Sequence, residues 1–174
     1  MPSVSGLSRQ QRSRARERAV QAALLGLHNK DEVRYTDPDV ASEAALRRDG
    51  IKNSRRARLG HFPRHSDCSS FATWCLWNAL FLPFGLDDVV NGASWTGGFT
   101  GTMLSHGKRV RHAKNARRGD CVLYGDEGTS GSHVTIIVGH KEGVPMVVSH
   151  GSDDGPFFLK FDYRDDVMQI RRYI

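Results

Sequence analysis

Apolar residues near the N-terminus recur with the period of an α-helix. Within residues 8–28 they fall at i, i+3, i+4 and i+7, which would place them on one helical face. Ser8 stands at the start of this segment and is a preferred helix cap. The positions on the predicted face are Val20, Ala23, Leu24 and Leu27. The pattern predicts an amphipathic helix, and the polar Glu17 and Gln21 argue against a secretory signal peptide.

Two further helices are predicted in the next part of the chain. Asp37-Pro38 provides a cap residue followed by proline at the first helical position, so a helix is expected to follow, from Val40 to Leu46. Residues 47–66 are rich in arginine and irregular, which favours a solvated loop. The strongest apolar periodicity runs from Cys68 to Leu82, and Pro83 is expected to end that helix.

The second half of the chain changes to the short runs that are typical of strands. A glycine-rich segment over residues 85–107, with at most one helical turn near Met103, separates the two halves. The expected strands are Cys121–Tyr124, His133–Val138, Met146–His150, Phe157–Phe161 and Val167–Tyr173. Turn residues between them indicate an antiparallel meander. Helices followed by strands predict an α+β fold, with N-terminal helices packed on an antiparallel sheet of five or six strands.

Composition narrows the function classes only in part. The 174 residues carry a net charge of +6, which favours an anionic partner such as nucleic acid, a membrane surface or a wall polymer. The apolar runs are too short for a transmembrane helix. Three cysteines without a Cys-x-x-Cys pair argue against a disulfide framework, a zinc ribbon and a thioredoxin-type site.

Cys68 is the first candidate for chemistry because it stands at a predicted helix start. The thiolate is the nucleophilic form of cysteine, and the N–H groups at a helix N-terminus favour an anion. A fall of about two units in its pKa would make the thiol mostly ionised at neutral pH. Asp67 opposes this effect unless its carboxylate turns away to cap the helix.

His133 and His150 are the candidates for the base. A turn at Lys141-Glu142 would place His133 directly opposite His150, and opposed residues share a sheet face. One imidazole would then contact the thiol while the other orients it. A bulge at Gly143 would shift the register by one residue and send the two rings to opposite faces.

Other interpretations of these residues remain open. Cysteines in helices more often pack than react, and a histidine on a strand is usually a surface or hydrogen-bonded residue. Cys68, His133 and His150 could instead form a zinc site, which would need a fourth ligand or a water.

Three segments resemble the motifs of the NlpC-type cysteine peptidases of peptidoglycan. They are Asp67-Cys68-Ser69-Ser70-Phe71, Arg118-Gly119-Asp120-Cys121-Val122-Leu123-Tyr124 and Ser132-His133-Val134-Thr135-Ile136-Ile137-Val138-Gly139. The resemblance implies a reduced papain-like fold over residues 31–174, with residues 1–30 as a helical arm. It implies that Cys68 is the nucleophile, His133 the general base and His150 the orienting residue. Ser70 and Thr135 depart from the family, which usually has glycine at both positions.

The resemblance also implies a substrate. Residues 148–156 resemble the corresponding region of phage endolysins that attack actinobacterial walls. A hydrolase of this kind would cleave the D-γ-glutamyl–diaminopimelate bond of the stem peptide, without metal or cofactor. Its partner would be peptidoglycan, not nucleic acid, and it would be a monomer without stable membrane insertion. It would be made in the host cytoplasm without a signal peptide and reach the wall after the membrane is permeabilised.

Four residues are expected to contact the substrate. They are Tyr35, Ser69, Trp95 and Ser132. The family places a tyrosine upstream of the nucleophile, and Tyr35 is the candidate, although it precedes Cys68 by more residues than is usual. Trp95 and Phe99 either line the groove or pack beneath their loop. An N-acetylmuramoyl-L-alanine amidase or an acyltransferase on the same fold, and a non-catalytic basic binding module, remain alternatives.

Overall fold

Six antiparallel strands form the sheet on which the helices pack. The computed structural model describes residues 3–37, 39–151 and 155–174. The strand order is β3-β8-β4-β5-β6-β7. The strands are β3 (Lys108–Val110), β4 (Cys121–Tyr124), β5 (His133–Lys141), β6 (Val144–Ser149), β7 (Phe157–Lys160) and β8 (Val167–Arg172). Strands form at all five predicted places, and β3 is an additional short strand at the edge. The predicted meander is correct from β4 to β7 but wrong for β8, which pairs with β4 and β3 instead of β7.

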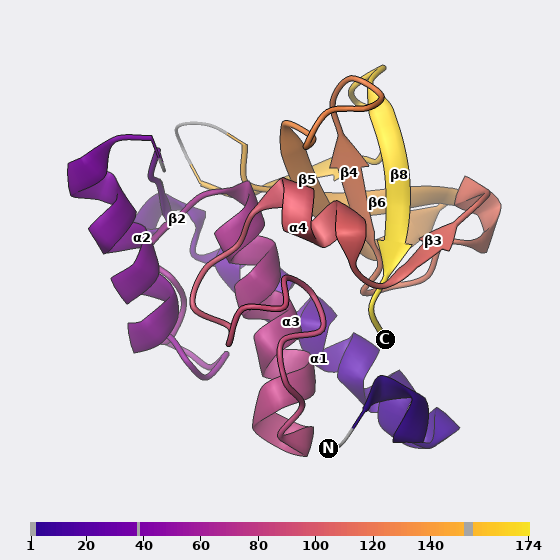
Figure 1. Cartoon of the computed structure of the whole chain (residues 1–174), viewed down its shortest axis with the longest axis horizontal. Coiled ribbons are helices and arrows are strands. Elements are labelled where there is room, and N and C mark those ends of the chain that lie inside the picture. The colour runs from indigo at the N-terminus through magenta and orange to yellow at the C-terminus, as the bar shows by residue number, and fades with distance from the viewer. Residues whose placement is uncertain (1–2, 38, 152–154) are drawn as a thin grey trace.

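Helices α1, α3 and α4 lie on one side of this sheet, whereas α2 packs against α3 and β2 beside it (Figure 1). The helices are α1 (Arg9–His28), α2 (Ala41–Asn53), α3 (Cys68–Phe84) and α4 (Thr100–Ser105), with short 3-10 turns at Val4–Gly6, Lys30–Glu32 and Ala113–Asn115. Two short parallel strands, β1 (Arg34–Tyr35) and β2 (His65–Ser66), pair with each other. The architecture is the predicted α+β fold. No helix in the described segments is long and apolar enough to cross a membrane.

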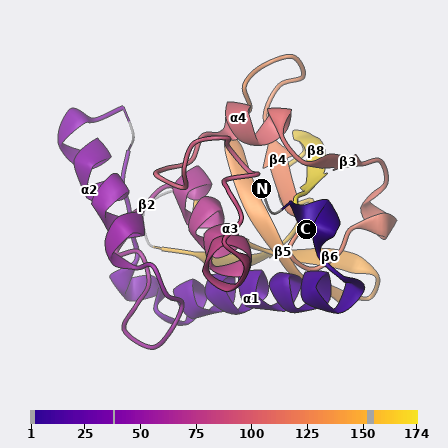
Figure 2. The same cartoon turned by 60° about the horizontal axis from the view of Figure 1, so that its bottom comes forward.

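Helix α1 is the predicted first helix, but its buried face differs from the predicted one. Ser8 and Gln11 form a capping box that satisfies backbone groups of the first turn. The buried positions are small, namely Ala15, Ala19, Val20, Ala22, Ala23 and Gly26, whereas Leu24 is exposed. The reason is close packing: a Cβ on Gly26 would collide with the ring of Phe71 on α3. Figure 2 shows α1 running beneath α3 and β5.

Helix α3 is buried on all sides and forms the centre of the core. Every residue from 68 to 80 is buried, so this helix has no solvent face in its first three turns. Pro83 lies within the last turn instead of ending the helix, and Gly85 provides the left-handed C-cap. The helix therefore ends two residues later than predicted, at Phe84 instead of Leu82, because Gly85 and not Pro83 ends it.

The region around α2 was only partly predicted. The helix begins after Val40, later than the Asp37-Pro38 signal indicates, and Pro38 lies outside the described residues. It continues to Asn53, so residues 47–53 of the supposed basic loop are helical. The predicted turn near Met103 is confirmed as α4.

The sheet has buried residues on both faces. Its helix-facing side belongs to the main core, to which α1 also contributes its alanines. The opposite side holds a smaller cluster that includes Val122, Tyr124 and Ile137. The expected boundary between an arm (1–30) and a domain (31–174) stays a prediction, but α1 packs within the same core as the rest of the chain.

Candidate active site

Cys68 is the first residue of α3 and lies against the sheet. Asp67 caps the helix: its carboxylate accepts hydrogen bonds from the Ser70 N–H (2.7 Å) and from the Ser69 hydroxyl (3.0 Å). The Ser70 hydroxyl accepts the Asp67 N–H at 2.9 Å, which completes a capping box. Ser70, which replaces the usual glycine of the family motif, therefore helps to fix the start of the helix that carries the thiol.

The ionisation predicted for Cys68 is not what the structure shows. Burial raises the pKa of Cys68 to about 12, and the charge of Asp67 adds to this rise. The backbone N–H groups of Val134, Ser69 and Cys68 itself lower the pKa, but by less. The side chain is only 7% exposed. The cost of desolvating a thiolate is therefore larger than the stabilisation that the helix N-terminus provides, and the resting residue is a neutral thiol.

Arg47 on α2 and Gly98 in the glycine-rich loop both contact the first turn of α3. The guanidinium of Arg47, on α2, forms an ion pair with the Asp67 carboxylate and donates to the Gly98 carbonyl at 3.1 Å. A Cβ on Gly98 would collide with the backbone carbonyl of Ser69. Two separate segments of the chain therefore meet at the first turn of α3, next to the thiol.

His133 begins β5 and its ring is held by a chain of hydroxyls. Its Nε2 is hydrogen-bonded to the Ser149 Oγ at 2.8 Å, and that oxygen is 3.1 Å from the Tyr163 hydroxyl. The Tyr124 ring packs beside the imidazole, with centroids 5.7 Å apart. Among the described residues, Nδ1 of His133 has no hydrogen bond, so this nitrogen is available to a reacting group.

The His133 imidazole is neutral at physiological pH. Burial lowers its pKa to about 4, and the charge of Arg164 and repulsion from a protonated His150 act in the same direction. Asp166 and Asp67 raise the pKa by less. A neutral ring can accept a proton, which is the state that a general base requires.

The predicted register of the β5–β6 hairpin is wrong. The turn is at Glu142-Gly143, two residues with positive φ, and Lys141 pairs with Val144. An irregularity between Ile137 and Gly139 then shifts the pairing by one residue. As a result Thr135 pairs with Ser149, so Ser149 shares the face of His133 while His150 points to the helix side.

His150 is buried in a different environment from the one expected. It is 1% exposed, and its Nε2 lies 2.9 Å from the Ser66 carbonyl. Its ring packs between Tyr35 and Phe71, at centroid distances of 5.5 and 5.6 Å. In the described chain, neither imidazole is hydrogen-bonded to the other or to Cys68. The hydrogen bond expected from His150 to His133 is made by Ser149 instead.

The predicted substrate contacts divide into two groups. Tyr35 and Ser132 lie where a substrate could reach them. Burial and the nearby Cys68 raise the pKa of Tyr35 to about 12, which places the phenol near the thiol. Ser132 is exposed, and its hydroxyl lies 3.2 Å from the Arg164 guanidinium. Ser69 is buried, and its hydroxyl is used by Asp67. Trp95 is also buried: its indole donates to the Leu86 carbonyl at 3.0 Å, so it packs beneath its loop and does not line a groove.

A cavity of about 370 Å³ opens beside His133. It is lined by His133, Ser149, Gly151, Phe157, Leu159, Tyr163 and Arg164. Gly151 closes over the imidazole, since a Cβ there would be 3.0 Å from the ring. The cavity gives a ligand access to the base and places a guanidinium nearby.

The alternative zinc site is not supported by the geometry. Within the residues that the structure describes, no group of three or more His, Cys, Asp or Glu side chains is arranged to hold a metal ion. Cys68, His133 and His150 therefore do not converge as ligands.

Sequence reasoning missed Ser149, Tyr163 and Arg47. Ser149 could have been predicted from the sequence, because the alternative register with a bulge places the residue before His150 on the same sheet face as His133. Arg47 and Tyr163 are distant in sequence from the residues they contact, and no local pattern marks them.

Comparisons with known proteins support the fold. No family model and no curated protein matches the sequence. Among solved structures, NlpC2 from Trichomonas vaginalis superposes with a TM-score of 0.56 at 17% identity, over 99% of this chain and 50% of that chain. NlpC1 from the same organism matches with a TM-score of 0.47 and 20% identity, over 79% of this chain and 46% of that one. The chain thus spans about half the length of these structures, and it shares the fold of NlpC2.

Proposed function

We propose that the chain is a thiol hydrolase that cleaves an amide bond in the stem peptide of bacterial peptidoglycan. The observation that carries the proposal is that α3 and β5 bring Cys68 and His133 to the same place. Cys68 stands in the first turn of α3, beside the backbone of Val134. The adjacent His133 is held through Nε2, and no described residue is hydrogen-bonded to its Nδ1. The motif resemblance and the likeness to NlpC2 support the same reading.

The mechanism follows from the two pKa values. With a thiol pKa of about 12 and an imidazole pKa of about 4, both groups are neutral at pH 7. Proton transfer from Cys68 to Nδ1 of His133 therefore accompanies attack on the carbonyl carbon and does not precede it. The S–C bond forms as the thiol proton moves to the imidazole.

The remaining steps use the same groups. The N–H groups that favour the thiolate, those of Cys68 and Ser69, are suited to stabilise the oxyanion as well. His133 then protonates the leaving amine as the C–N bond breaks. Water attacks the acyl-enzyme while His133 takes its proton, the carboxylic acid leaves, and the thiol recovers its proton.

Ser149 takes the orienting role in this proposal. When Nδ1 is the free base, Nε2 carries the proton and donates to the Ser149 oxygen. The Ser149 hydroxyl can in turn donate to Tyr163. This arrangement selects the tautomer that the reaction needs and stabilises the imidazolium formed during attack.

The substrate proposal rests on the resemblance and on charge. We propose cleavage of the D-γ-glutamyl–diaminopimelate bond. Arg164 lines the cavity beside His133 and is paired there with Asp166, and we propose that its guanidinium also attracts a stem-peptide carboxylate. The net charge of +6 would draw the chain toward an anionic wall. A monomer made in the cytoplasm and released to the wall after membrane permeabilisation belongs to the same proposal.

Digestion of purified peptidoglycan tests the proposal. Cys68→Ala should abolish release of soluble fragments, whereas Cys75→Ala, which removes another cysteine of α3, should retain activity if the fold is kept by circular dichroism. New free amino groups should appear on diaminopimelate. Amino groups on L-alanine would instead identify an amidase. Lysis that survives Cys68→Ala would refute the thiol mechanism.

A further inference from the structure

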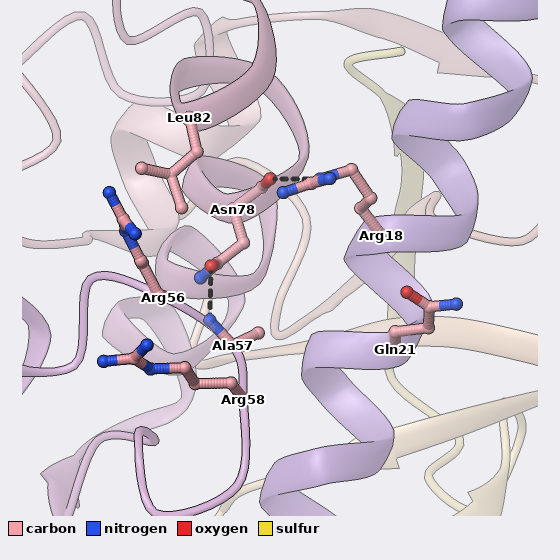
Figure 3. Close-up of a pocket in the computed structure, with 7 residues that line it drawn as sticks. All are labelled: Arg18, Gln21, Arg56, Ala57, Arg58, Asn78 and Leu82. Atoms are coloured by element: carbon pink, nitrogen blue, oxygen red, sulfur yellow. Dashed lines mark hydrogen bonds between the residues drawn. The ribbon is translucent and has the colours of Figure 1, made fainter.

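A second cavity lies between α1 and α3, away from the candidate active site (Figure 3). Its volume is about 400 Å³. It is lined by Arg18, Gln21, Arg56, Ala57, Arg58, Asn78 and Leu82. Asn78 and Leu82 follow Cys68 by ten and fourteen residues on α3, which places them about 15 and 21 Å from the start of the helix along its axis.

Three arginines surround this cavity, and none of them has an acidic partner among the described residues. Arg56 and Arg58 extend from the loop on one side, and Arg18 comes from α1 on the other (Figure 3). Among the ion pairs of the described residues, none involves these three guanidinium groups. The two basic stretches of the sequence, residues 9–18 and 47–64, thus meet around one cavity.

A buried asparagine fixes this arrangement. Asn78 is 2% exposed, and its side chain accepts the Ala57 N–H at 2.7 Å and donates to the Trp74 carbonyl at 2.9 Å. Its backbone carbonyl accepts the Arg18 Nε–H at 3.1 Å. One residue therefore anchors both the backbone of the loop between Arg56 and Arg58 and the arginine from α1, while the Arg58 guanidinium also lies 3.1 Å from Nε2 of His61.

We propose that this cavity binds a compact ligand that carries two or more phosphate groups. Guanidinium groups form bidentate hydrogen bonds with phosphate oxygens. A polyanion would also relieve the repulsion between these three guanidinium groups, which have no carboxylate partner among the described residues. The cavity is bounded by α1 on one side and the loop on the other, which suits a small polyanion or the end of a phosphate-bearing chain more than a flat membrane or a long duplex. The site is separate from the thiol chemistry and does not depend on it.

Calorimetric titration of the full chain with inorganic triphosphate tests the proposal at physiological ionic strength. Saturable binding at one site is expected, and the double variant Arg56→Gln/Arg58→Gln should weaken it by about tenfold or more. The control Arg14→Gln/Arg111→Gln removes the same charge from exposed arginines outside the cavity and should change the affinity by less than about twofold. Far-UV circular dichroism verifies that both variants fold.

Further arms of the experiment identify the source of the phosphate. A glycerol phosphate polymer that competes with triphosphate would assign the site to the phosphate groups of a chain, and failure to compete would assign it to a free oligophosphate. The proposal is overturned if triphosphate does not saturate, if the control variant loses as much affinity as Arg56→Gln/Arg58→Gln, or if a DNA duplex or anionic vesicles bind these residues in preference to triphosphate.

Discussion

At the scale of single residues, the Ser149 hydroxyl decides how His133 is presented. It is the direct partner of Nε2 at 2.8 Å, whereas His150 contacts the Ser66 carbonyl. Ser149→Ala should lower kcat on peptidoglycan fragments by about tenfold or more, because the imidazole loses its tautomer preference. Ser149→Thr keeps the hydroxyl and should restore most of the activity. Equal losses in both variants would indicate a packing role only.

The reactivity of Cys68 is the second prediction at this scale. Because burial raises its pKa to about 12, its alkylation by iodoacetamide should be slow at pH 6 and should accelerate about tenfold per pH unit up to pH 9. Cys75 and Cys121 are fully buried and should remain unmodified in the folded chain. Mass spectrometry of quenched samples measures each site. A rate that reaches a plateau near pH 6 would show that the thiol is ionised, contrary to this expectation.

At the scale of elements, the start of α3 depends on the glycine-rich loop. Gly98 lies directly on the Ser69 carbonyl, while Gly97 has only an ordinary contact with Arg47. Gly98→Ala should therefore reduce the free energy of unfolding by about 1–3 kcal/mol and lower activity, because the helix start must shift. Gly97→Ala is the matched control and should have little effect on either. Urea denaturation and fragment release measure the two quantities, and identical behaviour of the two variants would contradict the expected contact.

Elements and their order follow from local patterns, but contacts between them do not. The helix over 8–28 and the strand at Cys121–Tyr124 could be predicted because periodicity and turn residues are local. The hairpin register could not, since it depends on the turn position and on the irregularity near Val138. The raised pKa of Cys68 was missed for a related reason: desolvation by the surrounding elements is a property of the packed molecule.

At the scale of the whole molecule, two buried imidazoles make stability depend on pH. Burial lowers the pKa of His133 to about 4 and also lowers that of His150. Between about pH 6.5 and pH 4 the unfolded chain binds protons at these positions that the folded chain does not, so stability rises with pH across this window. Acidification from pH 7 to pH 4 should therefore cost up to about 3 kcal/mol through His133 alone.

Urea denaturation at a series of pH values measures this effect. His133→Gln should flatten the pH dependence between pH 4 and 6.5, because one of the groups responsible is removed. His140→Gln is the control, since His140 is exposed on the hairpin and should leave the slope unchanged. Activity should decline only as pH falls toward 4, where His133 becomes protonated and can no longer accept the thiol proton. Two results together would contradict this expectation: an activity profile whose acid limb is centred near pH 6.5, and a slope of stability against pH that His133→Gln leaves unchanged. They would show that this imidazole is solvated and that its buried contact with Ser149 does not persist in solution.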